Sequence, residues 1–194
     1  MVASRSADLA GQVRSGELTK LVLAPIDMFR FWLTKDLVDK VLNVSFAVLE
    51  IILVTIICKF PLYIPHKVCT IPFFIILVCL ATLLYFFLSF FISIIAFWTD
   101  EIWATRWLFG VVILDFFAGN FFPIDVLPGW LQKFAYLTPF PHLIFFPLKI
   151  WLEQVSFGES VRILLICAFW LLVFYKLAIW LWQKGVKNYG AFGG

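Results

Sequence analysis

The sequence predicts an all-α protein, a polytopic bundle of transmembrane helices. Hydrophobic residues make up 63% of its 194 positions and charged residues only 14%, with a mean hydropathy of +1.01. A soluble domain, by contrast, is roughly half apolar and a quarter charged. Several apolar stretches reach the ~20 residues with which a helix crosses a bilayer. Between two of them, residues 119–147 are apolar but interrupted by five prolines, so no piece of this stretch is long enough to span.

The polar and basic residues 1–40 are expected to form a loop on the cytoplasmic side. Within this loop Ser15 is suited to cap a short helix. Glu17 lies in its first turn, where the helix dipole favours a negative charge. Leu18 and Leu21 fall on one face of the same helix, at the spacing of an amphipathic pattern.

Pro25 ends this helix or starts the next one. The piece that follows, residues 28–40, mixes aromatic and charged side chains and is expected to lie on the membrane surface as an interfacial helix. For both pieces a solvated juxtamembrane helix without a docking role remains an open alternative.

The transmembrane domain is expected to cover residues 41–194. Four spans are predicted within it, at about residues 41–58, 71–97, 103–122 and 161–182. The proline-interrupted segment, residues 123–155, lies between the last two spans and is expected to form a re-entrant helical cap on the outer face. Apolar backbone that does not span must lie at the interface or dip in and return.

An even number of spans places both termini on the same side of the membrane. Nine Lys and Arg residues would lie on that side and five on the other, which predicts cytoplasmic termini by the positive-inside rule. The two sets are Arg5, Arg14, Lys20, Arg30, Lys35, Lys40, Arg106, Lys184 and Lys187, against Lys59, Lys67, Lys133, Lys149 and Arg162.

No set of residues indicates catalysis or metal binding. We find no Ser/His/Asp, Cys/His or paired-carboxylate arrangement, and no cofactor site. His66 and His142 lie in outer segments and are expected at a surface or interface. The spacing of the four cysteines fits neither disulfides nor a metal motif, so each is expected to pack as a small buried apolar side chain.

Three motifs, in this order, resemble the permease subunits of type-2 ABC exporters. The first is RSGEL at residues 14–18 with LAPI at 23–26, similar to the family's cytoplasmic loop. The second is FFPIDVLPGWL at residues 121–131, similar to the family's segment before the last span. The third is the tail KGVKNYGAFGG at residues 184–194. The resemblance covers essentially the whole chain.

The resemblance implies two groups of functional residues. The coupling helix, which would dock into a separate ATPase subunit, contains Arg14, Ser15, Gly16, Glu17, Leu18, Leu21 and Pro25. The outer cap contains Pro123, Asp125, Pro128, Gly129, Trp130, Pro139 and Pro147. Members of the family usually have six spans, with the SGEL loop between the second and third, so this chain is expected to lack the first two.

The resemblance also implies the function of a permease in an ATP-driven exporter, in the cell (inner or plasma) membrane of a prokaryote. No GxxxxGK[ST] loop occurs in the chain, so ATP would be bound by the partner ATPase. The path would form between two permease copies, surrounded by membrane lipid, and no nucleic acid is expected to bind. The alternatives are a membrane-embedded lipid-modifying enzyme and a truncated fragment that does not transport.

Two carboxylates within predicted spans are possible lining residues of a substrate path. Glu50 lies near the middle of its span, where burial of a charge in hydrocarbon is unfavourable by at least ~2.5 kcal/mol, so we favour a functional role. For Asp115 a functional role and a position near a helix end are both open. Lys176 is expected to extend its ammonium group toward the interface.

Overall fold

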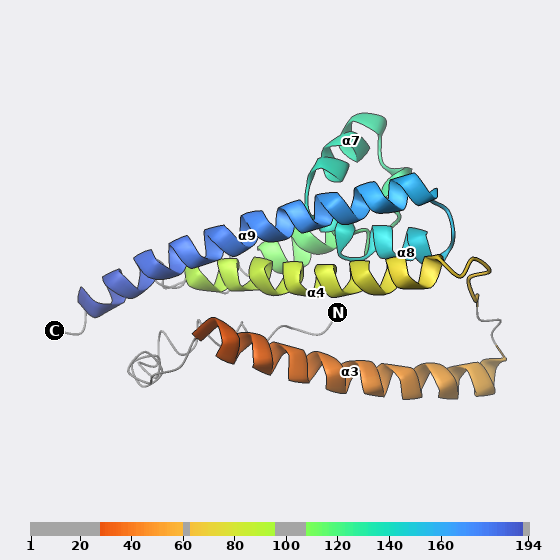
Figure 1. Ribbon diagram of the computed structural model, residues 1–194, viewed down its shortest axis with the longest axis horizontal. Coiled ribbons are helices and arrows are strands. Elements are labelled where there is room, and N and C mark those ends of the chain that lie inside the picture. Colours follow the sequence, from red (N-terminus) through yellow and green to blue (C-terminus); the bar gives the residue numbers. More distant parts are fainter. Residues whose placement is uncertain (1–27, 60–62, 96–107, 192–194) are drawn as a thin grey trace. The chain divides into compact units, whose positions relative to one another are not determined.

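The computed structural model describes residues 28–59, 63–95 and 108–191 (Figure 1). Every element in these ranges is a helix, which confirms the predicted all-α class. The chain divides into two compact units, Met1–Ile64 and Pro65–Gly194.

The first unit contains one described helix, α3 (Met28–Cys58), of 31 residues. It joins the amphipathic piece that we expected on the membrane surface to the first predicted span in one uninterrupted helix. No Pro or Gly lies between its ends, so nothing in the sequence breaks it at residue 41. Ser45 and Thr55 donate hydrogen bonds from their hydroxyl groups to the carbonyls four residues earlier, at 2.8 and 2.7 Å. Both hydroxyl groups thus have a hydrogen-bond partner within the apolar helix itself.

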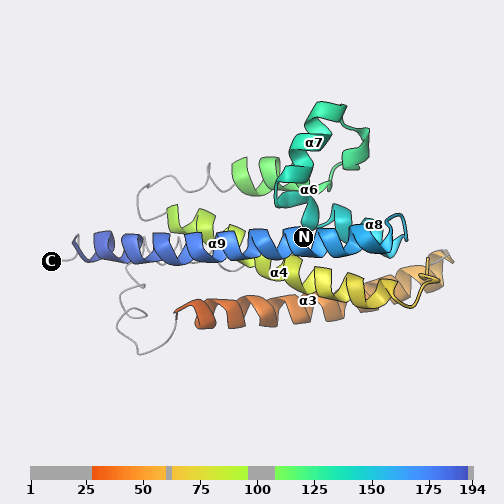
Figure 2. The same ribbon diagram turned by 45° about the horizontal axis from the view of Figure 1, so that its top comes forward.

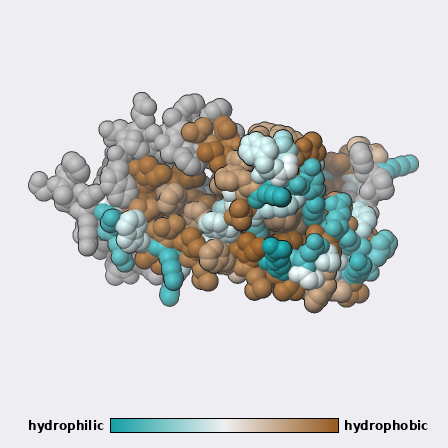
Figure 3. Space-filling view, turned by 90° about the horizontal axis from the view of Figure 1, so that it is seen from above, coloured by the Kyte–Doolittle hydropathy of each residue, from teal (hydrophilic) through white to brown (hydrophobic). Residues whose placement is uncertain are grey.

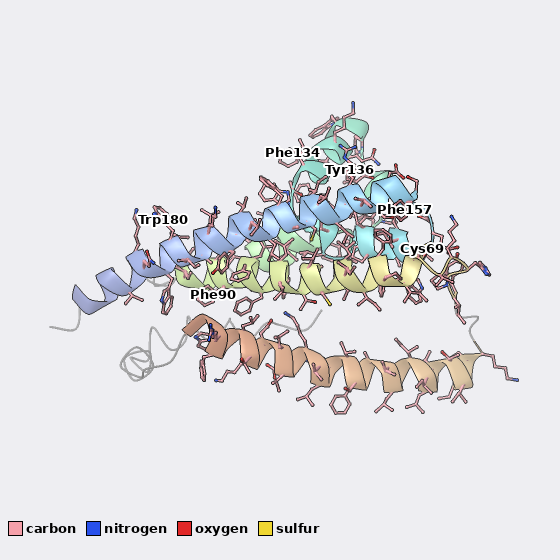
Figure 4. The ribbon with its side chains drawn as sticks, in the orientation of Figure 1. Cys69, Phe90, Phe134, Tyr136, Phe157 and Trp180 are labelled. Carbon is pink, nitrogen blue, oxygen red and sulfur yellow. The ribbon has the colours of Figure 1, made fainter. Side chains whose placement is uncertain are left out.

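The second unit is built on two long helices, α4 (Thr70–Ile94) and α9 (Phe157–Ala191), which run side by side in the same direction (Figure 1). Ring contacts join Phe73 to Phe157 near their starts, at 5.2 Å, and Phe90 to Trp182 further along, at 5.8 Å. Figure 4 shows Phe157 close to Cys69 at the shared starting end.

Two neighbouring parallel helices require the chain to return between them. The described part of this return consists of η3 (Leu108–Leu114), a π-helix, and α6 (Asp115–Ala118), which leads into the next segment (Figure 2). It falls in the predicted third span, of which residues 103–107 lie outside the described part. By length and composition, three of the described helices are able to cross a membrane: Arg30–Cys58, Thr70–Ile94 and Phe157–Val186.

The core of the second unit is a stripe of α4 packed against the other helices. Leu77, Ala81, Leu84 and Leu88 follow one face of α4 at helical spacing. Their partners are Leu114, Ala118, Leu143, Ile150, Ile163 and Cys167. Ala81, Ala118 and Cys167 are the small members of this core, and small side chains let membrane helices approach closely. The expected burial of cysteine is confirmed for Cys167 but is wrong for Cys58, Cys69 and Cys79, which are exposed.

Reciprocal capping fixes the start of α9. The Ser156 N–H donates to Glu159 Oε2 at 2.9 Å, and the Glu159 N–H donates to Ser156 Oγ at 3.3 Å. This capping box satisfies two of the N–H groups that a helix start leaves open. The helix therefore begins four residues before the predicted span at residue 161.

Gly119 ends α6 in a left-handed conformation, with φ of 82°. The Asn120 N–H donates to the Asp115 carbonyl at 3.1 Å, and the Gly119 N–H to the Phe116 carbonyl at 3.3 Å, the two bonds of a Schellman ending. A Cβ at this position would also lie 3.3 Å from Phe145 Cβ.

We expect Gly119→Ala to lower the free energy of unfolding by about 1–2 kcal/mol, because it adds backbone strain and a close contact. The measurement is the melting temperature in detergent. Gly158→Ala is the matched control, since nothing lies within 4 Å of its added Cβ; it should leave the melting temperature unchanged or raise it. Equal melting temperatures for the two variants would contradict this account of Gly119.

Candidate functional site

The cap, residues 123–155, consists of four short helices at the end where α4 and α9 begin (Figure 1). They are η4 (Ile124–Val126), α7 (Gly129–Leu137), η5 (Phe140–His142) and α8 (Phe145–Trp151). Pro123, Pro128 and Pro139 each stand immediately before one of these helices. The fixed φ of proline suits a helix start, and its missing N–H would have no partner there.

One half of the cap, η5 and α8, contributes most of the buried residues of the cap. Pro141, Leu143, Phe145 and Pro147 are buried in the second unit. The ring of Trp151 contacts the ring of Phe74 on α4, with centroids 4.8 Å apart. This half is held by the same apolar packing as the long helices.

The other half of the cap, η4 and α7, carries an exposed apolar face. Trp130, Phe134 and Leu137 lie on one side of α7, and are 73%, 55% and 74% exposed. Ala135, on a different side of the helix, is buried.

In the view from above, hydrophilic side chains gather toward the right-hand end, where Figure 1 shows the cap and the first turns of α9, while hydrophobic side chains fill the middle (Figure 3).

A polar network around Asp125 joins the two halves of the cap. Lys149, on α8, places its Nζ 2.7 Å from Asp125 Oδ2. Tyr136 and Gln132, one turn apart on α7, donate to Asp125 Oδ1 at 2.9 and 3.1 Å. Figure 4 shows Tyr136 on the side of α7 that faces the rest of the cap. The Lys149 ammonium also lies 4.8 Å from the centre of the Phe145 ring.

The groups of this network shift one another's pKa values and so keep their protonation states fixed. Burial raises the pKa of Asp125, but hydrogen bonds from Lys149, Tyr136 and Gln132 and the charge of Lys149 outweigh burial and hold the pKa below its usual value. Burial and the Asp125 carboxylate together raise the pKa of Tyr136 to about 12. Asp125 therefore stays ionised and Tyr136 stays protonated, as the hydrogen bond between them requires.

His142, at the end of η5, is buried, with 1% of its surface exposed. Neither ring nitrogen makes a hydrogen bond, and the ring lies 4.9 Å from that of Phe146. Burial lowers the pKa of His142 to about 4, and the nearby carbonyls of Pro139 and Thr138 offset this only in part. Our expectation of a surface or interface position is therefore wrong for His142, while His66 is exposed as expected.

The remaining predicted residues are placed as follows. Asp115 begins α6, one turn before the helix ends at Gly119, and is half-buried. Glu50 lies on the exposed surface of α3, in the first unit. Lys176 is exposed on α9. The predicted coupling residues Arg14, Ser15, Gly16, Glu17, Leu18, Leu21 and Pro25 lie outside the described residues.

Sequence reasoning named Asp125 in the cap but missed the side chains that hold it. Gln132 and Tyr136 are four residues apart on a short helix, and this spacing was a usable signal. Lys149 follows Asp125 by 24 positions, and no local pattern joins the two. Among the described residues, no group of three His, Cys, Asp or Glu side chains is arranged to hold a metal ion.

We expect stability to fall as the pH drops from 6.5 toward 4. Between these values the unfolded chain binds a proton at His142 that the folded chain excludes, so up to about 3 kcal/mol of stability is present above pH 6.5 and is lost on acidification. The measurement is the melting temperature at about pH 7.5 and about pH 4.5.

His142→Phe removes the buried titrating group and should flatten this pH dependence. His66→Phe, at an exposed histidine, should leave the dependence as in the native chain. A native slope in the His142→Phe variant would show that other groups cause the loss of stability.

Comparison with known proteins identifies the family. No curated protein and no solved structure matches the chain. The family model described as ABC-2 family transporter protein matches residues 1–193, which confirms the resemblance to type-2 ABC permease subunits. The match covers nearly the whole chain, and the described residues form an all-α membrane bundle, so the chain belongs to the ABC-2 family of transporter proteins.

Proposed function

We propose that this chain is the membrane subunit of an ATP-driven exporter, which moves a substrate out of the cytoplasm with energy from a separate ATPase subunit. The substrate path forms between two permeases, a second copy of this chain or a homologous one. The protein resides in the inner or plasma membrane of a prokaryote, with both termini in the cytoplasm.

The observation that supports this proposal most directly is the parallel arrangement of α4 and α9 with the cap at their common starting end. Because both helices leave the cap in the same direction, the polar network around Asp125 belongs to one face of the membrane. The C-terminal end of α9 then belongs to the other face. We assign the basic N-terminal residues to that same face from the even number of predicted spans and the positive-inside rule.

The ATPase subunit supplies the energy, since the sequence has no phosphate-binding loop of its own. The predicted coupling helix, between Arg14 and Pro25, is short and bounded by a cap and a proline. Such an element moves as a rigid lever and can pass a displacement from one subunit to another.

In this proposal, nucleotide-driven closure of the ATPase subunits tilts the permease helices, and the cap acts as a lid on the outer side. Glu50 and Asp115 are the candidate polar residues of the path, because a charge within the membrane requires a polar partner or water.

Leu18→Ala combined with Leu21→Ala should weaken binding of the ATPase subunit roughly thirtyfold. Two apolar side chains leave the docking face, and even partial loss of their burial amounts to about 2 kcal/mol. The measurement is the stimulated ATPase activity of the ATPase subunit co-purified with this chain. Membrane insertion of the variant is checked separately.

Lys20→Ala is the matched control, because Lys20 falls on the opposite face of the expected helix. It should leave the stimulated activity near the native value. Native activity in the double leucine variant would contradict the assigned coupling helix.

Cysteines introduced by Ser15→Cys and Tyr189→Cys should react with a membrane-impermeant maleimide only from the cytoplasmic side, and Lys133→Cys only from the opposite side. The exposed Cys58, Cys69 and Cys79 are first replaced by serine. Labelling of Ser15→Cys and Tyr189→Cys from different sides would contradict the proposed topology.

A further inference from the structure

Glu153 stands in a backbone conformation that side chains other than glycine rarely adopt. Its φ is +56°, in the left-handed region, immediately after the end of α8. The Gln154 N–H donates to the Lys149 carbonyl and the Glu153 N–H to the Ile150 carbonyl, both at 3.0 Å. These are the two bonds of a Schellman ending, with Glu153 in the position where glycine is usual.

Gly119 shows the usual solution in the same unit. It ends α6 with the same pair of bonds, and it adopts positive φ without strain. The chain thus uses glycine at one Schellman ending and glutamate at the other. An unfavourable backbone position occupied by a large side chain suggests that the side chain has a role there.

The Glu153 carboxylate binds the start of α4. Its Oε1 accepts the Lys67 N–H at 2.6 Å and the Thr70 hydroxyl at 3.3 Å, across 86 and 83 positions of sequence. Cys69, which precedes α4, makes no capping bond with its own side chain. A carboxylate from the turn after α8 therefore acts at this helix start, where the helix dipole favours a negative charge.

Lys149, one turn earlier on α8, holds Asp125 at 2.7 Å. Two charged residues near the end of α8 thus bind different elements: Lys149, on α8, binds η4 beside α7, and Glu153, just after α8, binds the start of α4. The ring contact of Trp151 with Phe74 lies between them in sequence. Polar contacts from the C-terminal part of α8 and the turn after it therefore reach the start of α4 on one side and, through Asp125, α7 on the other.

We propose that Glu153 is a positioning residue that clasps the cap to α4, so that α8 and the first turn of α4 move as one body and α7 follows. Where the chain works as the exporter proposed above, movement of α4 reaches the cap through this clasp. The clasp itself requires neither the ATPase subunit nor a substrate.

The test measures the distance between spin labels on Cys69 and on Lys133→Cys in the full chain in lipid nanodiscs. Both positions are exposed, and the other cysteines are replaced by alanine. The native background should give one narrow distance distribution. Glu153→Gly, which relieves the strain but removes the carboxylate, should at least double its width without lowering the melting temperature.

A purely local role of Glu153 at the end of α8, without the bonds to α4, predicts a different result. If Glu153 only ends α8, Glu153→Gly improves that ending, raises the melting temperature and leaves the width unchanged, which overturns the proposal. Glu153→Gln keeps a side-chain acceptor and should restore a width closer to the native one. A width equal to that of Glu153→Gly also overturns the proposal.

Two further variants keep the result interpretable. Gln154→Gly places glycine at the adjacent exposed position and should leave the width native. Thr70→Val removes the bond from the Thr70 hydroxyl without changing Glu153 and should broaden the distribution to a smaller extent. If neither Thr70→Val nor Glu153→Gly broadens the distance distribution, the clasp is excluded, whatever the outcome of the ATPase experiments.

Discussion

The structure depends on one constraint: within a membrane, backbone N–H and C=O groups must find partners inside the protein. Long helices without interior proline meet it, and α3, α4 and α9 are of this kind. Pro72 of α4 lies in the first turn, where its missing N–H leaves no bond broken. The prolines of the cap prevent a fourth long helix there. They are accommodated by dividing residues 123–155 into short helices, each of which begins where a proline is tolerated.

Dividing the cap in this way creates many helix ends, and several polar side chains in and beside this region serve helix starts. Ser156 and Glu159 cap α9, and Glu153 reaches the start of α4. The ion pair of Asp125 and Lys149 is partly exposed, and such pairs contribute only about 0–1 kcal/mol. Apolar packing by residues such as Leu143 therefore stabilises the cap, while the polar contacts determine the position in which it is held.

The sequence was sufficient for features that depend on local pattern. Apolar length predicted the long helices, and the prolines predicted short helices between α6 and α9. It was insufficient where contacts join distant positions. The pairing of Asp125 with Lys149 and of Glu153 with Lys67 follows from how α8 packs on the bundle. The burial of His142 has the same origin, because no periodic pattern shows that η5 turns inward rather than toward the surface.

α3 and α9 extend beyond the predicted spans for a different reason. Hydropathy marks where a segment is apolar, whereas a helix continues until its backbone bonds are interrupted or capped. α3 therefore begins at Met28, well before the apolar residues, and α9 continues to Ala191.

A cap that lacks a span of its own must be joined to the bundle by side chains if it is to respond to movement of the helices. Apolar contacts such as that of Trp151 with Phe74 resist separation but tolerate sliding, because they have no fixed direction. Hydrogen bonds from Lys67 and Thr70 to one carboxylate have defined geometry and resist sliding as well. The strained backbone at Glu153 is consistent with this division of roles. Glycine would adopt this backbone conformation without strain. The directional contacts with Lys67 and Thr70 give a reason for glutamate at that position.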